Sequence, residues 1–304
     1  MSAPKTSARN FGPSFGCDLI VLGDRLTPRP LEHAVVYLVA LVGLVLARRN
    51  IPHSRAYLQA VTGRPASLFQ VWKHYQRMVF SLVRKLRAAR GLLPRVVLPP
   101  SAPADYAKLR DSGDGILFGT FHVGDSDILG CLLGPFFSRR VTMVRLRVGN
   151  SADTERLARK YAGHLDYLWI DRPEDVLFGI KGAIGEGRPI ALQCDRDEHA
   201  SRTEYFRFLG ARRRFPFTLY HLAALLRKPV GIAFAVPRAD GASEVHTPPL
   251  FFPDPAAPRD EVLRAGAEHF QGVLDTLEAI LKRDPYVWFN FTPLNEPEPA
   301  AAHP

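Results

Sequence analysis

The chain has 304 residues, of which 46% are hydrophobic and 23% charged, a composition that is typical of a folded globular protein and leaves disorder to the ends. Forty Lys and Arg residues against thirty Asp and Glu residues give a net charge of +10, which indicates an anionic partner: nucleic acid, acidic lipid headgroups or an acidic carrier protein. A solvated basic surface is the alternative. The three cysteines lie far apart and form no C-x-x-C pair, which favours a reducing compartment.

One long apolar run stands near the N-terminus. Residues 1–30 lack an apolar core followed by a small-residue cleavage site, so we expect an irregular segment and no secretory signal. Residues 34–47, "AVVYLVALVGLVLA", would form a helix of about 21 Å, which is shorter than the hydrocarbon core of a bilayer, about 30 Å. Arg48 and Arg49 follow the run. The pattern predicts a helix that is buried or that lies on an anionic membrane, and a tilted span beginning at Leu31 is the alternative.

Residues 31–93 have helical periodicity and form a predicted helical leader. After the apolar run, "SRAYLQAVTG" indicates a helix capped by Ser54, and a longer helix begins at Ser67 and ends at Gly91. The following "LLPRVVLPPSAP" is a connector interrupted by proline.

From residue 114 onward, short apolar runs alternate with longer amphipathic ones. This alternation predicts an α/β fold in which helices flank a central, mostly parallel sheet. The predicted strands are 115–121, 141–147, 166–170, 189–194 and 230–237, and the predicted helices are 152–162, 174–186, 216–227 and 260–283. We therefore expect a single domain made of an irregular segment (1–30), the helical leader (31–93), an α/β core (114–291) and a flexible tail (292–304).

A histidine stands at the end of the first predicted strand, "GILFGTF", where open α/β sheets place their ligands. After His122, Gly124 permits a sharp turn and Asp125 or Ser126 can cap the next helix, whose first turn would contain Asp127. A carboxylate in that position can hydrogen-bond to the imidazole and fix its tautomer. The spacing therefore predicts that His122 is a general base oriented by Asp127. The alternative is an ordinary loop histidine near an aspartate that only complements the helix dipole.

Other chemistries fit the sequence less well. Ser126 lies in "GDSDI", which lacks the last glycine of the G-x-S-x-G nucleophile elbow. The spacing H-x4-D differs from the zinc motif H-E-x-x-H, and the histidines are scattered along the chain. The one acidic cluster that would suit an ion is "DRDEH", residues 195–199. We therefore expect no metal. No Walker or G-x-G-x-x-G element follows a predicted strand, so we expect no bound cofactor.

The segment "FHVGDSD" resembles the H-x4-D/E motif of glycerolipid acyltransferases, in the version found in the bacterial late acyltransferases of lipid A biosynthesis. Further blocks follow in that family's order: "VRLRVGN", in which an arginine closes a strand, "ALQCDRD", with an aspartate at a strand end, and "FRFLGARRRFPF", which leads into a helix. Upstream, "SRAYLQAVTGRPASLFQVWKHYQRMVFSLVRKLR" is similar to the family's helical leader. The resemblance covers about residues 30–291 and extends to the broader lysophospholipid acyltransferase-like superfamily.

The resemblance implies transfer of a fatty acyl group from a thioester, on acyl carrier protein or coenzyme A, to a hydroxyl or amine of a lipid or glycolipid. It implies that His122 and Asp127 are catalytic and that Arg145 stabilises the oxyanion or holds a phosphate. Asp195 and Arg196 follow the predicted strand 189–194, so we expect the sheet to present them on the same rim as His122, where they would position the site or the acceptor. For Arg145, a strand-end side chain that faces solvent is the alternative.

Two further groups have functional and structural interpretations. The run Arg212 to Arg214 beside "FPF" favours docking to anionic lipid or to an acyl carrier protein, and a solvated run is the alternative. The aromatic residues near the motif suit an acyl tunnel, and core packing is the alternative; they are Phe118, Phe121, Phe136 and Phe137.

The acceptor stays open, because Asp127 stands where the lipid A enzymes usually have glutamate and "YVWFNF" differs from their basic ending. The resemblance implies a peripheral or monotopic protein on the cytoplasmic face of a bacterial inner membrane, with no nucleic-acid partner. Two other functions remain. One is a non-catalytic protein that binds anionic lipid or nucleic acid in a manner that depends on salt and not on His122. The other is a thioesterase or esterase that uses water as the acceptor.

Overall fold

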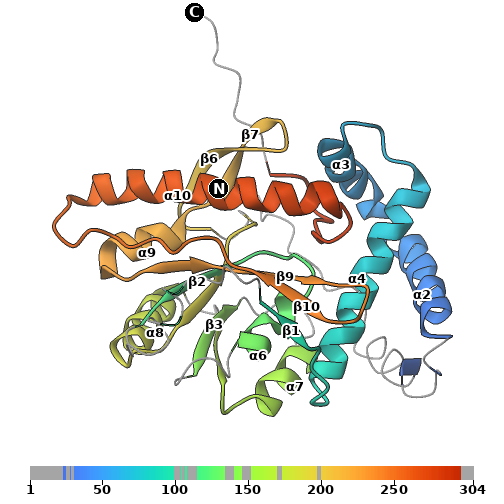
Figure 1. Cartoon of the computed structure of the whole chain (residues 1–304), viewed down its shortest axis with the longest axis horizontal. Coiled ribbons are helices and arrows are strands. Elements are labelled where there is room, and N and C mark those ends of the chain that lie inside the picture. The colour runs from blue at the N-terminus through green and yellow to red at the C-terminus, as the bar shows by residue number, and fades with distance from the viewer. Residues whose placement is uncertain are drawn as a thin grey trace, which may run out of the picture.

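The computed structural model describes residues 23–24, 28, 31–98, 104, 107, 115–133, 140–145, 152–169, 173–196 and 200–295. Its centre is a sheet of five parallel strands in the order β4-β3-β5-β2-β8 (Figure 1). In chain order these strands are β2 (Leu117–Thr120), β3 (Val141–Arg145), β4 (Leu165–Trp169), β5 (Ile190–Gln193) and β8 (Val230–Ile232). The predicted α/β class with a parallel sheet between helices is confirmed.

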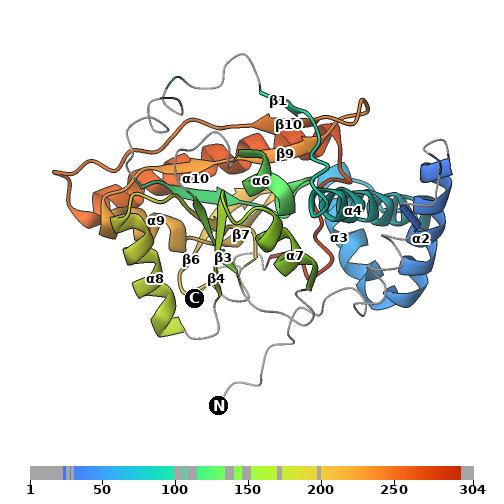
Figure 2. The same cartoon turned by 90° about the horizontal axis from the view of Figure 1, so that it is seen from below.

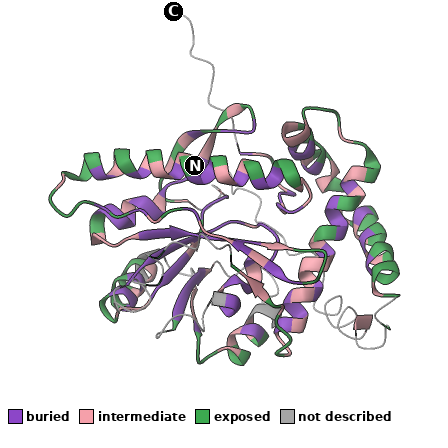
Figure 3. Ribbon diagram, in the orientation of Figure 1, coloured by how far each residue is buried: buried purple, intermediate pink, exposed green. Residues whose placement is uncertain are grey.

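Both faces of the sheet are covered, as expected for parallel strands that are apolar on both sides. Every residue of β2 is buried, and the burial pattern alternates little along the central strands (Figure 3). Leu117 belongs to a core shared with α8 (Pro173–Gly185), α9 (Thr218–Leu226) and α10 (Arg259–Arg283). Phe118 belongs to the core on the other face, which is shared with α6 (Leu129–Leu133), α7 (Ala152–Lys160) and a small second sheet. The strands of that sheet are, in order, β1 (Val96–Val97), β10 (Ser243–His246) and β9 (Phe234–Pro237).

The predicted leader is a group of three helices, α2 (Glu32–Leu46), α3 (Ile51–Thr62) and α4 (Leu68–Ala88), which lie together at one end of the molecule (Figures 1 and 2). Ser67 begins α4 with a capping box, because its Oγ accepts from the Gln70 amide at 3.2 Å and the Gln70 side chain accepts from the Ser67 amide at 2.8 Å. The predicted cap at Ser54 is wrong, because α3 begins at Ile51 and Ser54 is buried within it.

Helix α2 packs on α4 along one narrow face and leaves the rest of its apolar surface exposed. Its buried residues are Val36, Ala40 and Leu44. The exposed large apolar residues of this region are Leu31, Val35, Tyr37, Leu38, Leu41, Val42, Val45 and Leu46. Among the described residues, no single helix is long and apolar enough to cross a membrane. Residues 32–46 and 48–62 pass that test only as a pair, and the pair is bent by 81°.

Two features differ from the sequence-based prediction. The predicted strand 230–237 is two strands, because the chain leaves the central sheet at Ala233 and continues as β9, which pairs antiparallel with β10. A hairpin of β6 (Thr203–Phe208) and β7 (Ala211–Pro216) lies where only a basic run was noted. Its two-residue turn has positive φ at Leu209 and Gly210, 49° and 76°, which matches the twist of a hairpin. The hairpin was not predicted because the arginines of β7 interrupt the apolar alternation that is typical of a strand.

Candidate active site

Two adjacent parallel strands bring a histidine and an aspartate to one point of the C-terminal rim. Strands β2 and β5 are neighbours, and Thr120 pairs with Gln193. His122 and Asp195 each follow two residues after those paired positions. The ladder continues past the strands, because the Cys194 amide donates to the Thr120 carbonyl at 2.8 Å. Sheet register therefore places the two side chains together although 73 residues separate them.

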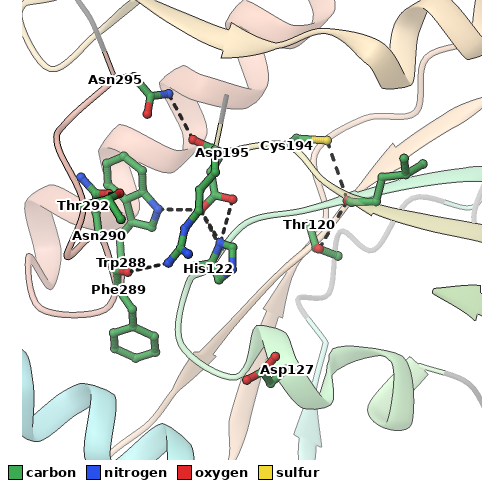
Figure 4. Close-up of polar contacts among 12 residues, drawn as sticks. Thr120, His122, Asp127, Cys194, Asp195, Trp288, Phe289, Asn290, Thr292 and Asn295 are labelled. Carbon is green, nitrogen blue, oxygen red and sulfur yellow. Dashed lines mark hydrogen bonds and ion pairs between the residues drawn. The ribbon is translucent and has the colours of Figure 1, made fainter. Parts of the chain in front are cut away.

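Asp195 holds the imidazole of His122 (Figure 4). Nδ1 of His122 lies 2.9 Å from Oδ1 and 3.0 Å from Oδ2 of Asp195, and the His122 amide donates to Oδ2 at 2.8 Å. Two bonds from one residue to one carboxylate fix both the ring and the main chain. The strand-end position of Asp195 predicts a positioning residue on this rim, and the geometry gives it the imidazole as its partner.

The charge state of Asp195 determines the tautomer of His122. Burial acts to raise the pKa of Asp195, but attraction to His122 and Arg196 and hydrogen bonds from His122 and Trp288 outweigh it and lower this pKa to about 2. An ionised carboxylate only accepts hydrogen bonds, so in the neutral form of the ring Nδ1 carries the proton and Nε2 keeps its lone pair. The His122 side chain is 22% exposed. Nε2 has no hydrogen-bond partner among the described residues and is the basic atom of the site.

The C-terminal part of the chain completes the surroundings of Asp195. Nε1 of Trp288 donates to Oδ2 of Asp195 at 2.9 Å, and Nδ2 of Asn295 donates to the main-chain carbonyl oxygen of Asp195 at 3.1 Å. Neither residue is predicted from the sequence as part of the site, and Asn295 falls in the predicted flexible tail although its side chain is buried. A lone tryptophan in "YVWFNF" carries no spacing signal that links it to a strand end.

The predicted hydrogen bond between His122 and Asp127 is wrong. Asp127 lies in the short turn η3 (Ser126–Ile128), apart from the ring (Figure 4). Its Oδ1 accepts from Nη2 of Arg145 at 2.9 Å, and its Oδ2 lies 3.3 Å from Nζ of Lys85. The physical reason is the direction of the chain: Nδ1 of His122 faces the neighbouring strand β5, whereas the turn carries Asp127 toward β3 and α4.

Two cations share the carboxylate of Asp127. Burial acts to raise the pKa of Asp127, but Lys85 and Arg145, with a smaller contribution from His122, outweigh it and hold this pKa well below its usual range. Arg145 is the last residue of β3 and lies at the rim, as its position at a strand end predicts. Lys85 comes from α4 and is buried, and the sequence predicts it only as part of a helix.

Helix α4 fastens the loop that follows His122. Arg84 donates from Nε and Nη2 to the two carboxylate oxygens of Asp125, both at 2.7 Å, and Ser81 donates to the Gly124 carbonyl at 2.7 Å. Asp125 is therefore a buried ion-pair partner and not the helix cap that its spacing suggested. Gly124 has φ 53°, and a Cβ there would collide with the Ala235 carbonyl, so only glycine suits this turn.

A small apolar cavity of about 30 Å³ lies behind the loop, between the sheet and α6. This volume holds only about one or two water molecules, so a larger ligand would enter only if the lining side chains moved. The cavity is lined by Phe118, Gly119, Thr120, Leu129, Gly130, Val141, Met143, Ala191 and Ala233. Of the four aromatic residues proposed for a tunnel, Phe118 lines it, whereas Phe121 packs against Phe234 and Phe270 in the other core. Residues 136 and 137 lie outside the described residues.

The other predicted polar residues have mixed outcomes. Arg196 lies next to Asp195, and its Nη2 is 3.4 Å from the Phe289 carbonyl. Of the acidic cluster 195–199, residues 197–199 lie outside the described residues. Within the described part of the chain, no group of three or more His, Cys, Asp or Glu residues is arranged to hold a metal ion.

The arginines of β7 do not form one solvated patch. Arg212 is exposed, whereas Arg213 is half-buried and donates to the Asn295 carbonyl at 3.2 Å. Burial lowers the pKa of Arg213. Docking of this run to anionic lipid or to an acyl carrier protein stays a prediction.

The arrangement has definite chemical capacity. A neutral imidazole with a fixed tautomer can take a proton from a hydroxyl, an amine or water, and cations at the same rim can stabilise an oxyanion. The neighbouring cavity has an apolar lining but, at about 30 Å³, is smaller than a hydrocarbon chain. The chain matches no protein-family model and no curated protein sequence.

Proposed function

We propose that this protein is an acyltransferase, which moves a fatty acyl group from an acyl thioester to a hydroxyl or amine of a lipid or glycolipid. Acyl carrier protein or coenzyme A carries the thioester. The observation that carries the proposal is the contact of 2.9 Å between His122 and Asp195 beside an apolar cavity. A base with a fixed orientation favours proton abstraction from an acceptor. The apolar lining of the small cavity favours a hydrocarbon substrate, which the cavity would admit once its side chains move apart. The resemblance of residues 30–291 to lipid A and lysophospholipid acyltransferases supports the same reaction.

In the proposed reaction, Nε2 of His122 takes the proton of the acceptor hydroxyl or amine while the acceptor atom bonds to the thioester carbon. The electron pair of the C=O π bond moves to oxygen and gives a tetrahedral oxyanion. Collapse of the oxyanion restores C=O and breaks the C–S bond, and the leaving sulfur takes the proton from His122. Asp195 holds the tautomer and stabilises the imidazolium between the two transfers. No covalent acyl-enzyme is formed.

Arg145 is proposed to stabilise the oxyanion or to hold a phosphate of the donor or acceptor, and Lys85 joins it in this role. The fixed fork of donors on arginine suits both tasks. Asp127 then orients the two cations, Arg145 at 2.9 Å and Lys85 at 3.3 Å, and does not orient the imidazole. Arg196, at the end of β5, is proposed to position the acceptor.

The exposed apolar face of α2 is proposed to lie on an anionic membrane. Leu38, Leu41 and Val45 are 63%, 50% and 65% exposed, and the exposed Arg48 and Arg49 follow the helix. Apolar side chains beside cations suit the boundary between acyl chains and anionic headgroups. This placement fits a peripheral or monotopic protein on the cytoplasmic face of a bacterial inner membrane, where lipid acceptors are present.

Mass spectrometry of total lipids from cells with and without the protein tests the proposal. We expect one lipid species to gain one acyl chain in cells with the wild type, and we expect it to be absent with His122→Ala. His164→Ala replaces an exposed histidine and is the matched control, which should behave as the wild type.

The same experiment separates the other functions. A thioesterase would release free fatty acid and leave the lipids unchanged. A non-catalytic binding protein would give the same lipid profile with the wild type, with His122→Ala and without the protein. Either result would overturn the acyltransferase proposal.

A further inference from the structure

We infer that Trp288 positions the catalytic pair, because its indole N–H holds the Asp195 carboxylate in the orientation that fixes His122. The catalytic consequence rests on the proposed function, whereas the geometric claim concerns only the tautomer of His122 and holds for any reaction at this site. The inference extends the pair to three residues from three separate parts of the chain.

The hydrogen bonds to Asp195 show why a third residue is needed. Among the described residues, three groups donate to this carboxylate: Nδ1 and the amide of His122, and Nε1 of Trp288 at 2.9 Å. Two of the three belong to the residue that Asp195 must orient. Trp288 thus fixes the carboxylate from a separate part of the chain. Donors of this kind around a functional group set its orientation and commonly change activity when they are removed.

The tryptophan is itself rigid. Its side chain is fully enclosed, with 1% of the residue exposed. Its neighbours in the chain pair with the loop of His122: the Phe289 amide donates to the His122 carbonyl at 2.8 Å, and the Gly124 amide donates to the Val287 carbonyl at 2.7 Å. The backbone segments that carry the indole and the imidazole are therefore joined by the same short antiparallel contact.

The helical leader holds the tryptophan from behind. Nε2 of His74 donates to the Trp288 carbonyl at 2.8 Å, and Nδ1 of His74 accepts from Oγ of Ser54 at 2.8 Å. The Tyr57 ring lies edge-on to the indole at 5.2 Å, and its hydroxyl donates to the Pro285 carbonyl at 2.7 Å. Helices α3 and α4 thus support Trp288 and, through it, the Asp195 carboxylate.

NMR of protein with ¹⁵N-labelled histidine tests the geometric claim without any substrate. In the wild type we expect the neutral ring of His122 to carry its proton on Nδ1, with slow exchange of that proton with water. In Trp288→Phe we expect exchange to be about tenfold faster and the Nε2–H tautomer to appear, because a donor to a buried charge is lost. Trp72→Phe is the matched control: Trp72 also donates from Nε1 to a carbonyl, that of Tyr37 at 3.3 Å, but away from the site.

Turnover tests the catalytic claim. In Trp288→Phe we expect kcat for acyl transfer to fall by about 10- to 100-fold with KM nearly unchanged, because Asp195 still binds His122 but orients it poorly. If Trp288→Phe does not fold, benzothienylalanine at position 288 keeps the two-ring shape and removes only the N–H donor. An unchanged tautomer and exchange rate in the folded variant would overturn the inference. An altered NMR signal with unchanged kcat would overturn its catalytic consequence. If the wild type shows no acyl transfer at all, the proposed function fails and the NMR result still decides the role of Trp288.

Discussion

His122 and Asp195 contact each other at 2.9 Å because they occupy equivalent positions past the ends of two adjacent parallel strands. The base of the site is therefore oriented across the sheet, and not from within its own loop. Asp127, five residues after His122, instead contacts Arg145 and Lys85. This division gives the two aspartates different tasks, one for the base and one for the cations.

Gly130 is expected to limit the length of the acyl chain that the protein accepts. It lines the cavity, and a Cβ at this position would lie 3.0 Å from both Met143 Sδ and Leu165 Cδ2. Gly130→Val should push these side chains into the cavity and shorten the preferred chain, since each buried CH₂ contributes about 0.8 kcal/mol. A competition assay with donors of several chain lengths, read by mass spectrometry, measures the shift.

The control for Gly130→Val is Gly182→Val in α8, where a Cβ would meet nothing within 4 Å. This variant should keep the wild-type product distribution. The cavity would lose its proposed role if Gly130→Val folded and transferred the same chains in the same proportions as the wild type.

His74 should make the protein less stable as the pH falls. Burial lowers its pKa from 6.5 to about 4, so between these values the unfolded chain binds a proton that the folded chain does not. Stability is thus fully present above pH 6.5 and declines toward pH 4, by about 3 kcal/mol for a shift of this size. His74→Gln should be less stable than the wild type at pH 7 and should depend less on pH in this window.

Urea unfolding at several pH values measures this effect. The exposed His164→Gln is the control and should keep the wild-type slope. An identical pH slope for His74→Gln and the wild type would show that His74 is not the buried neutral group that links the leader to Trp288.

The apolar face of α2 should bind the protein to anionic vesicles. Serine at Leu38, Leu41 and Val45 removes exposed side chains and leaves the buried contacts of α2 with α4 in place. We expect the triple variant to float with such vesicles at least about tenfold less than the wild type, because each lost apolar side chain weakens insertion by about 1 kcal/mol or more.

Phe178→Ser and Leu225→Ser together form the control, since these residues are 75% and 60% exposed but lie on α8 and α9. The control should float as the wild type does. Equal flotation of the triple variant, or no binding by the wild type, would contradict the proposed membrane surface.

The strand pattern of the core could be predicted from the sequence because short apolar runs end at polar or glycine-containing turns. Strand ends then predicted that His122, Arg145 and Asp195 share one rim, and the structure confirms this. The order of strands in the sheet is not encoded in any local pattern. Without the neighbour relation of β2 and β5, a spacing of five residues favoured Asp127 over Asp195.

Residues outside the core could not be predicted as part of the site. Lys85 lies on a helix whose periodicity indicates only which face is buried, and the fold turns that face toward the rim. An isolated antiparallel bridge between residues 123 and 288 brings Trp288 near Asp195, and no strand pattern in the sequence predicts this bridge. Long-range contacts of this kind depend on how complete elements pack, and a single sequence carries no signal for them.

The turnover of Asp195→Asn and Asp127→Asn, measured side by side, tests the central claim most directly. We expect Asp195→Asn to lose about 1,000-fold or more in kcat, because an amide neither holds the Nδ1–H tautomer nor stabilises the imidazolium. We expect Asp127→Asn to keep more activity, because the His122–Asp195 contact stays intact. Loss of activity in Asp127→Asn together with wild-type turnover in Asp195→Asn would contradict the account.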